Sequence, residues 1–284
     1  MSTTQFGSSR EDLITRSTVY ASDLFAGKTV VVTGAGGGLG LAIAALFARL
    51  GANLAINGRD EEKLASAREF LESFGGKVFT RVMTIRDPDQ VEEFVAAVNA
   101  EFGAIDVLVN NAGGQFPQAA LDFSRKGWNA VIDTNLNGTW WMMQSAARHW
   151  VETGQPGSIV NIVADIWRGM PGIAHTCAAR AGVIYLSKSV AVEWAPHKIR
   201  VNCVAPGCCE SNGFGRYPAE GAATFQDSNP MRHAGDEWDV AEGVVYMAAS
   251  SGKFVTGEVL NIDGGQQLWG DPWPTGRPSY FQIS

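Results

Sequence analysis

A glycine-rich run, Thr-Gly-Ala-Gly-Gly-Gly-Leu-Gly at residues 33–40, offers the clearest chemistry in this sequence. It follows a short β-branched segment and opens a segment with helical periodicity. Glycines at such a junction let the backbone approach a pyrophosphate, and the first helical turn supplies free N–H groups and positive potential. The position between strand and helix makes the run a strong indication of a dinucleotide site. The residues expected to contact the dinucleotide are Gly34, Gly36, Gly38, Leu39 and Gly40.

The second predicted strand ends in Asn57-Gly58-Arg59-Asp60. A site for NAD usually places a carboxylate at this point to hold the ribose 2′-hydroxyl, whereas a site for NADP places an arginine near the 2′-phosphate. Gly58 stands where the acid is expected, and Arg59 follows it. A guanidinium suits a phosphate geometrically. We therefore predict NADP; the alternative is an exposed arginine at a helix start.

The metal-ligating residue types are scattered. Four cysteines stand at 177, 203, 208 and 209, and four histidines at 149, 175, 197 and 233. Neither set has the spacing of a zinc site, so we predict no metal centre. Scattered cysteines in a chain of this kind are typical of reduced thiols, which predicts a cytoplasmic location.

The elements that must position these residues follow from the periodicity. Short apolar runs that predict strands cover residues 28–33, 53–57, 77–84, 105–110, 158–163, 199–204 and 258–262, and helical periodicity between them covers segments such as 39–50, 61–74 and 87–102. Nearly continuous apolar strands separated by helices indicate a parallel sheet covered on both faces. Right-handed crossovers then give a doubly wound α/β sheet of about seven strands, a Rossmann fold, with its ligand site at the carboxyl ends of the strands.

Length and composition fit a single domain, because the chain has 284 residues, 45% hydrophobic and 18% charged. We place the dinucleotide-binding domain at 27–265, between an N-terminal extension at 1–26 and an aromatic C-terminal tail at 266–284. The segment 210–235, long and broken by Gly and Pro, is predicted to be a substrate lid. The net charge of −7 argues against nucleic acid and anionic membranes as partners. No apolar run is long enough to predict a membrane span, and the N-terminus lacks a signal core.

Further motifs stand at matching places along this pattern: Asn110-Asn111-Ala112-Gly113, Asn135, Pro206-Gly207 and Asn261-Ile262-Asp263-Gly264-Gly265. With the glycine run they resemble the short-chain dehydrogenase/reductase family, over about residues 28–265. The resemblance implies a nicotinamide dinucleotide cofactor. It also implies a homotetramer formed through the helices around 124–150 and 175–195.

The resemblance assigns roles to single residues. Beyond the glycine run and Arg59, it places these residues at the cofactor: Thr84, Ile85, Asn111, Ala112, Gly113, Arg180, Pro206, Gly207 and Ser211. Thr84 replaces an aspartate near the adenine, and Ser211 replaces a threonine that contacts the nicotinamide amide. Asn135 would hold a water in a proton relay.

The catalytic motif departs from the family pattern. The Ala-Gly-Val at 181–183 sets the register, which puts Thr176 at the family's tyrosine and Arg180 at its lysine. Residues 163–164, Val and Ala, lack the expected serine hydroxyl. Tyr185 and Lys188 are three residues apart instead of four and lie further along the helix, so they do not restore the motif.

These replacements change the predicted reaction. Reduction of a ketone needs an acid tuned toward neutral pH, and neither threonine nor arginine supplies one. A hydroxyl and a guanidinium can still polarise a carbonyl, as conjugate reduction requires. The segments 110–116, 126–140 and 174–196 are similar to the branch of trans-2-enoyl-CoA and 2,4-dienoyl-CoA reductases. That resemblance implies a conjugated acyl thioester or a related enone as substrate.

Two other groups could supply the proton. Asp165 follows the fifth strand and would act as a general acid if burial raised its pKa; the alternative is a solvated loop acid. His175 titrates near neutral pH, but adjacent helix residues point about 100° apart, so it is expected to face away from Thr176. Either acid would give a carbonyl reductase or alcohol dehydrogenase. A third reading is an NADP-binding protein without redox turnover.

Overall fold

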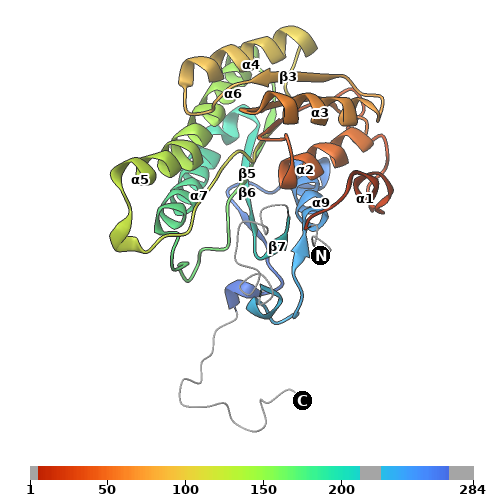
Figure 1. The fold of residues 1–284 in the computed structure, drawn as a ribbon. Helices are drawn as coiled ribbons and strands as arrows, with labels where there is room; N and C mark the ends of the chain where they lie inside the picture. Colours follow the sequence, from red (N-terminus) through yellow and green to blue (C-terminus); the bar gives the residue numbers. More distant parts are fainter. Residues whose placement is uncertain (1–5, 212–224, 269–284) are drawn as a thin grey trace.

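A single parallel sheet organises the protein. The structure, a computed structural model, describes residues 6–211 and 225–268 (Figure 1). Seven strands form one sheet in the order β3-β2-β1-β4-β5-β6-β9, every neighbouring pair parallel. The strands are β1 (Thr29–Thr33), β2 (Asn53–Gly58), β3 (Val78–Val82), β4 (Val107–Asn110), β5 (Gly157–Ile162), β6 (Ile199–Pro206) and β9 (Val259–Ile262). The predicted doubly wound Rossmann sheet of seven strands is confirmed.

Helices connect the strands on both faces of the sheet. They are α1 (Arg10–Thr15), α2 (Gly38–Arg49), α3 (Glu61–Glu72), α4 (Pro88–Phe102), α5 (Arg125–Ile132), α6 (Thr139–Thr153), α7 (Ala174–Trp194) and α9 (Glu237–Ala248). A π-helical turn, Asp133–Gly138, joins α5 to α6. A short second pair of strands, β7 (Cys209–Glu210) and β8 (Gly235–Asp236), lies between β6 and α9.

Alternation along the strands divides the core into two layers. On β1, the side chains of Val30 and Val32 pack with α2, α3 and α9, while Val31 packs with α4, α6 and α7 on the other face. The period of two in a strand produces this division. The strand order reverses between β1 and β4, so a crevice for a ligand is expected at the carboxyl ends of these two strands.

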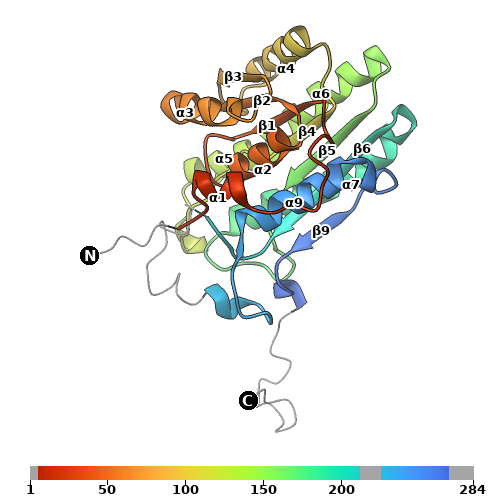
Figure 2. The same cartoon turned by 90° about the vertical axis from the view of Figure 1, so that its right-hand side faces the viewer.

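The described part of the predicted N-terminal extension packs against the domain. Its helix α1 begins with a capping box between Ser9 and Asp12, and it lies beside α2 (Figure 2). Leu13 of α1 and Phe25 are both buried in the core layer formed by α2 and α9. The described part of residues 1–26 therefore belongs to the domain, because its apolar side chains complete that layer.

Two other predicted segments fall largely outside the described residues. Of the predicted lid, 210–235, the structure describes residues 210–211 and 225–235, including a short 3₁₀ helix at Phe225–Ser228. Of the predicted tail, it describes residues 266–268. The roles predicted for these two segments remain predictions.

Candidate active site

The glycine run forms a close-packed turn between β1 and α2. Gly34 has a φ of 69°, in the left-handed region that favours glycine, and its N–H donates to the Asn57 carbonyl oxygen at 3.0 Å. A Cβ on Gly40 would lie 2.6 Å from the Gly34 carbonyl oxygen. Only glycine fits there, and the turn presents its backbone with the N-terminus of α2 toward the crevice. This cradle fits a dinucleotide pyrophosphate.

The end of β4 is tied to the end of β1. The Asn111 side-chain amide donates to the Thr33 carbonyl oxygen at 2.9 Å. The backbone N–H groups of Asn111 and Ala112 both donate to the Thr33 hydroxyl, at 3.0 and 2.9 Å. These bonds show that Asn111 and Ala112 hold the sheet edge together; their contact with the cofactor remains a prediction.

Arg59 lies exposed at the carboxyl end of β2, just before α3. The carboxylate of Asp60 caps α3 by accepting the Lys63 N–H at 3.0 Å. Lys63 stands 3.4 Å, at its Cβ, from the place where a Cβ on Gly36 would lie. The Lys63 side chain therefore starts beside the glycine turn, and its ammonium lies 3.3 Å from the Asp60 carboxylate. Lys63 was not predicted as a site residue, although its place in the first turn of α3 is a usable signal.

The residues expected near the adenine have mixed surroundings. Thr84 is half-buried, and its backbone N–H donates to the Gln90 side chain at 3.2 Å. Ile85 is buried against Gly138, where an added Cβ would lie 2.7 Å from its Cγ1. The Ile85 side chain therefore serves packing against the π-helical turn. A contact of either residue with adenine remains a prediction.

Asn135 lies in the π-helical turn, and its side-chain amide forms two hydrogen bonds with the backbone of Gly114. Its Nδ2 donates to the Gly114 carbonyl oxygen at 2.9 Å, and its Oδ1 accepts the Gly114 N–H at 3.0 Å. This two-way bond anchors the loop that follows β4. Asn135 thus has a shown structural role, and its role as holder of a catalytic water remains a prediction.

The two residues of α7 that are predicted to stand at the family's tyrosine and lysine positions are both buried. Thr176 is 2% exposed and Arg180 is 7% exposed. The Arg180 guanidinium lies against Gly113, so that a Cβ at Gly113 would collide with Nη2. Its Nη1 is buried without a hydrogen-bond partner, and among the described residues no carboxylate pairs with it. Burial lowers the pKa of Arg180 to about 10, which still leaves it cationic at neutral pH.

His175 contacts Thr176 directly, contrary to the expectation that it faces away. Its Nδ1 accepts the Thr176 backbone N–H at 2.7 Å and lies 3.3 Å from the Thr176 hydroxyl oxygen. The first helical turn allows this contact, because a side chain there can fold back onto free N–H groups. The ring is fully buried between Phe116 and Phe123, with centroids 4.7 and 4.4 Å away. Burial lowers the pKa of His175, so the imidazole is neutral at neutral pH.

Asp165 is buried instead of solvated, which removes the alternative reading as a loop acid. It is 7% exposed, and its backbone N–H donates to the Pro206 carbonyl oxygen at 3.0 Å. Burial, and after it the charge of Asp263, raises the pKa of Asp165. Gly207 packs against Asp263, where an added Cβ would lie 2.7 Å from the Asp263 Cα. Ser211 is half-buried a few residues further on.

The described tyrosines lie away from this group. Tyr20 donates its hydroxyl to the Glu242 carbonyl oxygen on α9, and Tyr246 lies on the same helix. Tyr185 is 69% exposed on α7, with the Lys188 ammonium over its ring. Tyr185 and Lys188 are thus ordinary surface residues of the helix. Tyr217 and Tyr280 lie outside the described residues.

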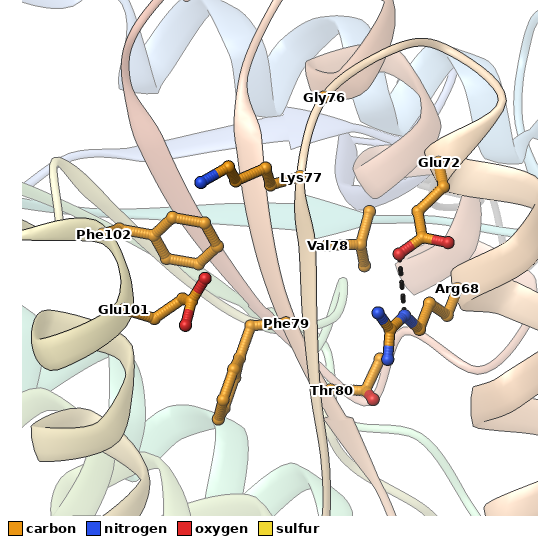
Figure 3. A pocket seen from close by; sticks show the side chains of 9 residues that line it. All are labelled: Arg68, Glu72, Gly76, Lys77, Val78, Phe79, Thr80, Glu101 and Phe102. Atoms are coloured by element: carbon orange, nitrogen blue, oxygen red, sulfur yellow. Dashed lines mark hydrogen bonds and ion pairs between the residues drawn. The ribbon is translucent and has the colours of Figure 1, made fainter.

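Two pockets of the described protein lie outside the dinucleotide crevice, because no residue of the glycine turn lines either of them. One of about 550 Å³ is lined by the end of α3, the start of β3 and the end of α4 (Figure 3). It lies at the amino ends of the strands, opposite the glycine turn. The other, of about 400 Å³, is lined by residues of α5 and its preceding loop, among them Phe123 and Trp128, and by Ala174. This second pocket adjoins the aromatic cluster around His175.

The described residues contain neither a candidate metal site nor a candidate membrane span. Within residues 6–211 and 225–268, no three His, Cys, Asp or Glu side chains are grouped to hold a metal ion. Among the helices of those ranges, none combines the length and apolar character needed to cross a membrane. All four cysteines are free thiols.

Comparisons with known proteins agree with this geometry. The family model described as Enoyl-(Acyl carrier protein) reductase matches residues 34–267. A probable 2,4-dienoyl-CoA reductase of Bacillus subtilis is 34% identical over 87% of this chain and 98% of its own length. A 3-oxoacyl-(acyl-carrier-protein) reductase of Thermotoga maritima is 36% identical over 84% and 97%.

A solved structure gives the same result in three dimensions. The short chain dehydrogenase of Bacillus anthracis superposes with a TM-score of 0.80 at 36% identity, covering 87% of this chain and 99% of that one. The sheet order, the glycine turn and the tied ends of β1 and β4 occur together with these likenesses. The chain therefore belongs to the short-chain dehydrogenase/reductase family of oxidoreductases that use a nicotinamide cofactor.

Proposed function

We propose that this protein is an NADPH-dependent reductase of a conjugated carbon–carbon double bond, in an enoyl or dienoyl thioester or a related enone. One observation carries the proposal. Thr176 and Arg180, which the family resemblance puts at the tyrosine and lysine positions, are buried in α7, and Arg180 lies against Gly113 with Nη1 unpaired. In the proposed site a hydroxyl and a fixed cation take the place of a tunable phenol.

These groups suit an oxyanion better than a proton transfer to oxygen. The reduced nicotinamide supplies hydride to the β-carbon when it is bound. Charge then develops on the substrate carbonyl oxygen, and each well-placed hydrogen-bond donor to such an oxygen contributes roughly 3 kcal/mol. Thr176 can donate its hydroxyl hydrogen, and Arg180 stays cationic at working pH. The α-carbon can take its proton from water.

The relatives support this reaction class without singling it out. The Bacillus subtilis relative bears the name of a dienoyl-CoA reductase, and the matching family model that of an enoyl reductase. The preference for NADP draws on Arg59, an exposed cation at the carboxyl end of β2, and on Lys63, whose Cβ lies beside Gly36. The free thiols fit a reducing compartment such as the cytoplasm.

A substrate panel tests the reaction. Oxidation of NADPH is followed with an enoyl-CoA, a dienoyl-CoA, an unsaturated ketone and a saturated ketone. We expect turnover with at least one conjugated substrate and none with the saturated ketone. Loss of turnover in Tyr217→Phe or Tyr280→Phe would contradict the proposal, since a phenol would then be supplying the proton.

The cofactor preference has its own test. Arg59→Ala should weaken NADPH binding by about tenfold or more, because a charge-assisted hydrogen bond contributes about 1.5–3 kcal/mol, and should leave NADH binding nearly unchanged. Lys77→Ala, an exposed cation at the opposite end of the sheet, is the matched control. Equal weakening of NADPH and NADH binding in Arg59→Ala would exclude a role at the 2′-phosphate.

A second reaction is favoured by Asp165. Its raised pKa and burial are those of a general acid, and the Thermotoga maritima relative bears the name of a 3-oxoacyl reductase. In that case the panel would show ketone reduction that Asp165→Asn abolishes. Tight NADPH binding without turnover on any substrate would instead point to a binding protein.

We also propose a homotetramer. Tyr185 and Val192 are 69% and 77% exposed on α7, and Trp128 is 38% exposed on α5. Apolar side chains on these helices lose contact with water in an interface between copies. Light scattering should give four times the chain mass, and Val192→Glu should lower it.

A further inference from the structure

The imidazole of His175 has a geometry that serves Thr176. Ile173, the residue before α7, caps the helix with no side-chain hydrogen bond. The Thr176 N–H donates to the Ile173 carbonyl oxygen at 2.9 Å, and the His175 Nδ1 supplies a second acceptor for it at 2.7 Å. The ring thus fixes the backbone of the residue whose hydroxyl the proposed reaction uses.

The same contact defines the tautomer of the ring. With the Thr176 N–H as donor to Nδ1, the hydrogen of the neutral imidazole is on Nε2; donation from Nδ1 to the Ile173 backbone, the other polar contact of the ring, would place it on Nδ1 instead. Nε2 is buried and has no hydrogen-bond partner among the described residues. The orientation of the ring therefore comes from Nδ1 and from the packing of Phe116 and Phe123.

An unpaired buried N–H costs folding free energy. A phenylalanine would fill the same aromatic box without that cost, so packing alone does not explain a histidine here. A local cost of this kind is typical of residues kept for function. The Thr176 hydroxyl oxygen lies 3.3 Å from Nδ1, longer than a strong O–H hydrogen bond, so its hydrogen stays available to a ligand.

We propose that His175 is a positioning residue that holds the Thr176 hydroxyl toward the substrate carbonyl, with Nδ1 as acceptor and without transferring a proton itself. This inference rests on the proposed function of Thr176. It separates His175 from the role of general acid, which would need a proton on the nitrogen that faces Thr176.

Two variants separate positioning from packing. His175→Phe keeps a ring between Phe116 and Phe123 but removes the acceptor. His175→Asn keeps an acceptor, since Oδ1 of asparagine stands near the place of Nδ1, but gives up most of the ring packing. We expect His175→Phe to retain the melting temperature and NADPH affinity while kcat falls about tenfold or more and KM changes little. We expect His175→Asn to melt lower but to keep kcat within about threefold of the original protein.

A double-mutant cycle with Thr176→Val tests the coupling. If His175 acts through Thr176, then His175→Phe should slow the Thr176→Val protein no further. An unchanged kcat in His175→Phe, equal slowing in both backgrounds, or an asparagine variant as slow as the phenylalanine variant would each overturn the inference.

A readout without substrate keeps this result distinct from the proposed function. Nitrogen NMR of the ligand-free protein should show the Nε2–H tautomer, and hydrogen exchange at the Thr176 amide should quicken in His175→Phe but not in His175→Asn. If the amide responds in this way but no conjugated substrate is turned over, the proposed function fails and the contact stands. If exchange is unchanged in His175→Phe, the positioning role fails regardless of activity.

Discussion

Arg180 and Asp165 are charged side chains in a buried site. Arg180 has no ion-pair partner among the described residues. Burial raises the pKa of Asp165, and the like charge of Asp263 raises it further, by more than the cation Arg168 lowers it. Burial of charge lowers stability, so each side chain is retained at a cost that a ligand can offset. Arg180 therefore allows a measurement in which stability and binding change in opposite directions, and Asp165 allows a measurement of stability against pH.

Arg180→Met should stabilise the ligand-free protein and weaken cofactor binding. The methionine removes a buried cation whose Nη1 has no partner, so the free energy of unfolding should rise by about 1–3 kcal/mol. Loss of the guanidinium beside Gly113 should raise the Kd of NADPH by about tenfold or more. Urea denaturation and fluorescence titration give the two quantities. A variant that is both less stable and unchanged in affinity would show that Arg180 is structural.

Asp165→Asn should change how stability depends on pH. Because the pKa of Asp165 is raised in the folded state above its ordinary value of 3.8, the folded protein binds the proton more tightly than the unfolded chain. Stability is therefore lost as pH rises from 3.8 through the raised pKa, and the loss is complete above it. The asparagine variant lacks this loss, so its melting temperature relative to the original protein should be higher at pH ~7.5 than at pH ~3.5. A difference in melting temperature that does not depend on pH would contradict the burial of the carboxylate.

At the scale of elements, the site is the meeting point of loops that follow β1, β4, β5 and β6. The helices hold these loops through contacts between segments far apart in the chain, such as the pair formed by Asn135 and Gly114. The turn between β1 and α2 is closely packed, because a Cβ on Gly40 would lie within 2.6 Å of both the Gly34 carbonyl oxygen and the Asn111 side-chain nitrogen.

Gly40→Ala should therefore disturb the turn, and Gly37→Ala should not. A Cβ on Gly40 would lie 2.6 Å from the Gly34 carbonyl oxygen, which forces backbone movement and should cost about 1–3 kcal/mol. Gly37 has an extended backbone and nothing within 4 Å of an added Cβ, so its change should stay within about 0.5 kcal/mol. Chemical denaturation of both variants is the check; equal stability would refute the close packing.

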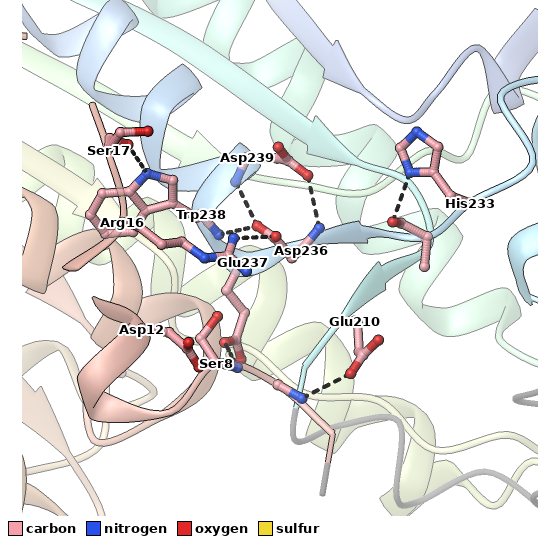
Figure 4. A network of polar contacts seen from close by, with 12 residues as sticks. Ser8, Asp12, Arg16, Ser17, Glu210, His233, Asp236, Glu237, Trp238 and Asp239 are labelled. Carbon is pink, nitrogen blue, oxygen red and sulfur yellow. Dashed lines mark hydrogen bonds and ion pairs between the residues drawn. The ribbon is translucent and has the colours of Figure 1, made fainter. Parts of the chain in front are cut away.

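At the scale of the whole molecule, the N-terminal segment is bonded to the start of α9, whose Glu237 carboxylate lies near Gly38 of the glycine turn. Ser8 donates its N–H to the Glu237 carboxylate at 2.8 Å, and Arg16 pairs with Asp236, the N-cap of α9 (Figure 4). The Trp238 indole N–H donates to the Ser17 carbonyl oxygen at 3.1 Å. These contacts join the first described residues to an element more than two hundred positions later in the sequence.

Two neighbouring residues of α1 provide a matched test of whether this segment packs on the domain. Leu13 is 2% exposed, so Leu13→Ala should lower the free energy of unfolding by about 2–4 kcal/mol. Ile14 is 49% exposed, and Ile14→Ala should change it by less than about 0.5 kcal/mol. Equal, small effects measured by urea unfolding would mean that the segment does not pack on α2 in solution.

The sheet and its cofactor crevice could be predicted because their signals are local. Apolar runs of strand length and the glycine run at 33–40 specify elements over a few residues each, and right-handed crossovers limit how such elements can be joined. The contact of His175 with Thr176 could not be predicted, because helical periodicity describes regular turns and this contact forms at a helix end, where free N–H groups redirect a side chain.

The sequence alone determined the family and the seven-stranded fold, and it predicts that Thr176 and Arg180 stand where a tyrosine and a lysine are expected. Only the tertiary structure decided that Asp165 is buried, that Arg180 lies unpaired against Gly113, and that residues near the N-terminus pack on α2 and α9. Burial and pairing depend on which distant segments meet across the sheet. A residue type does not carry that information, and local periodicity does not reach that far.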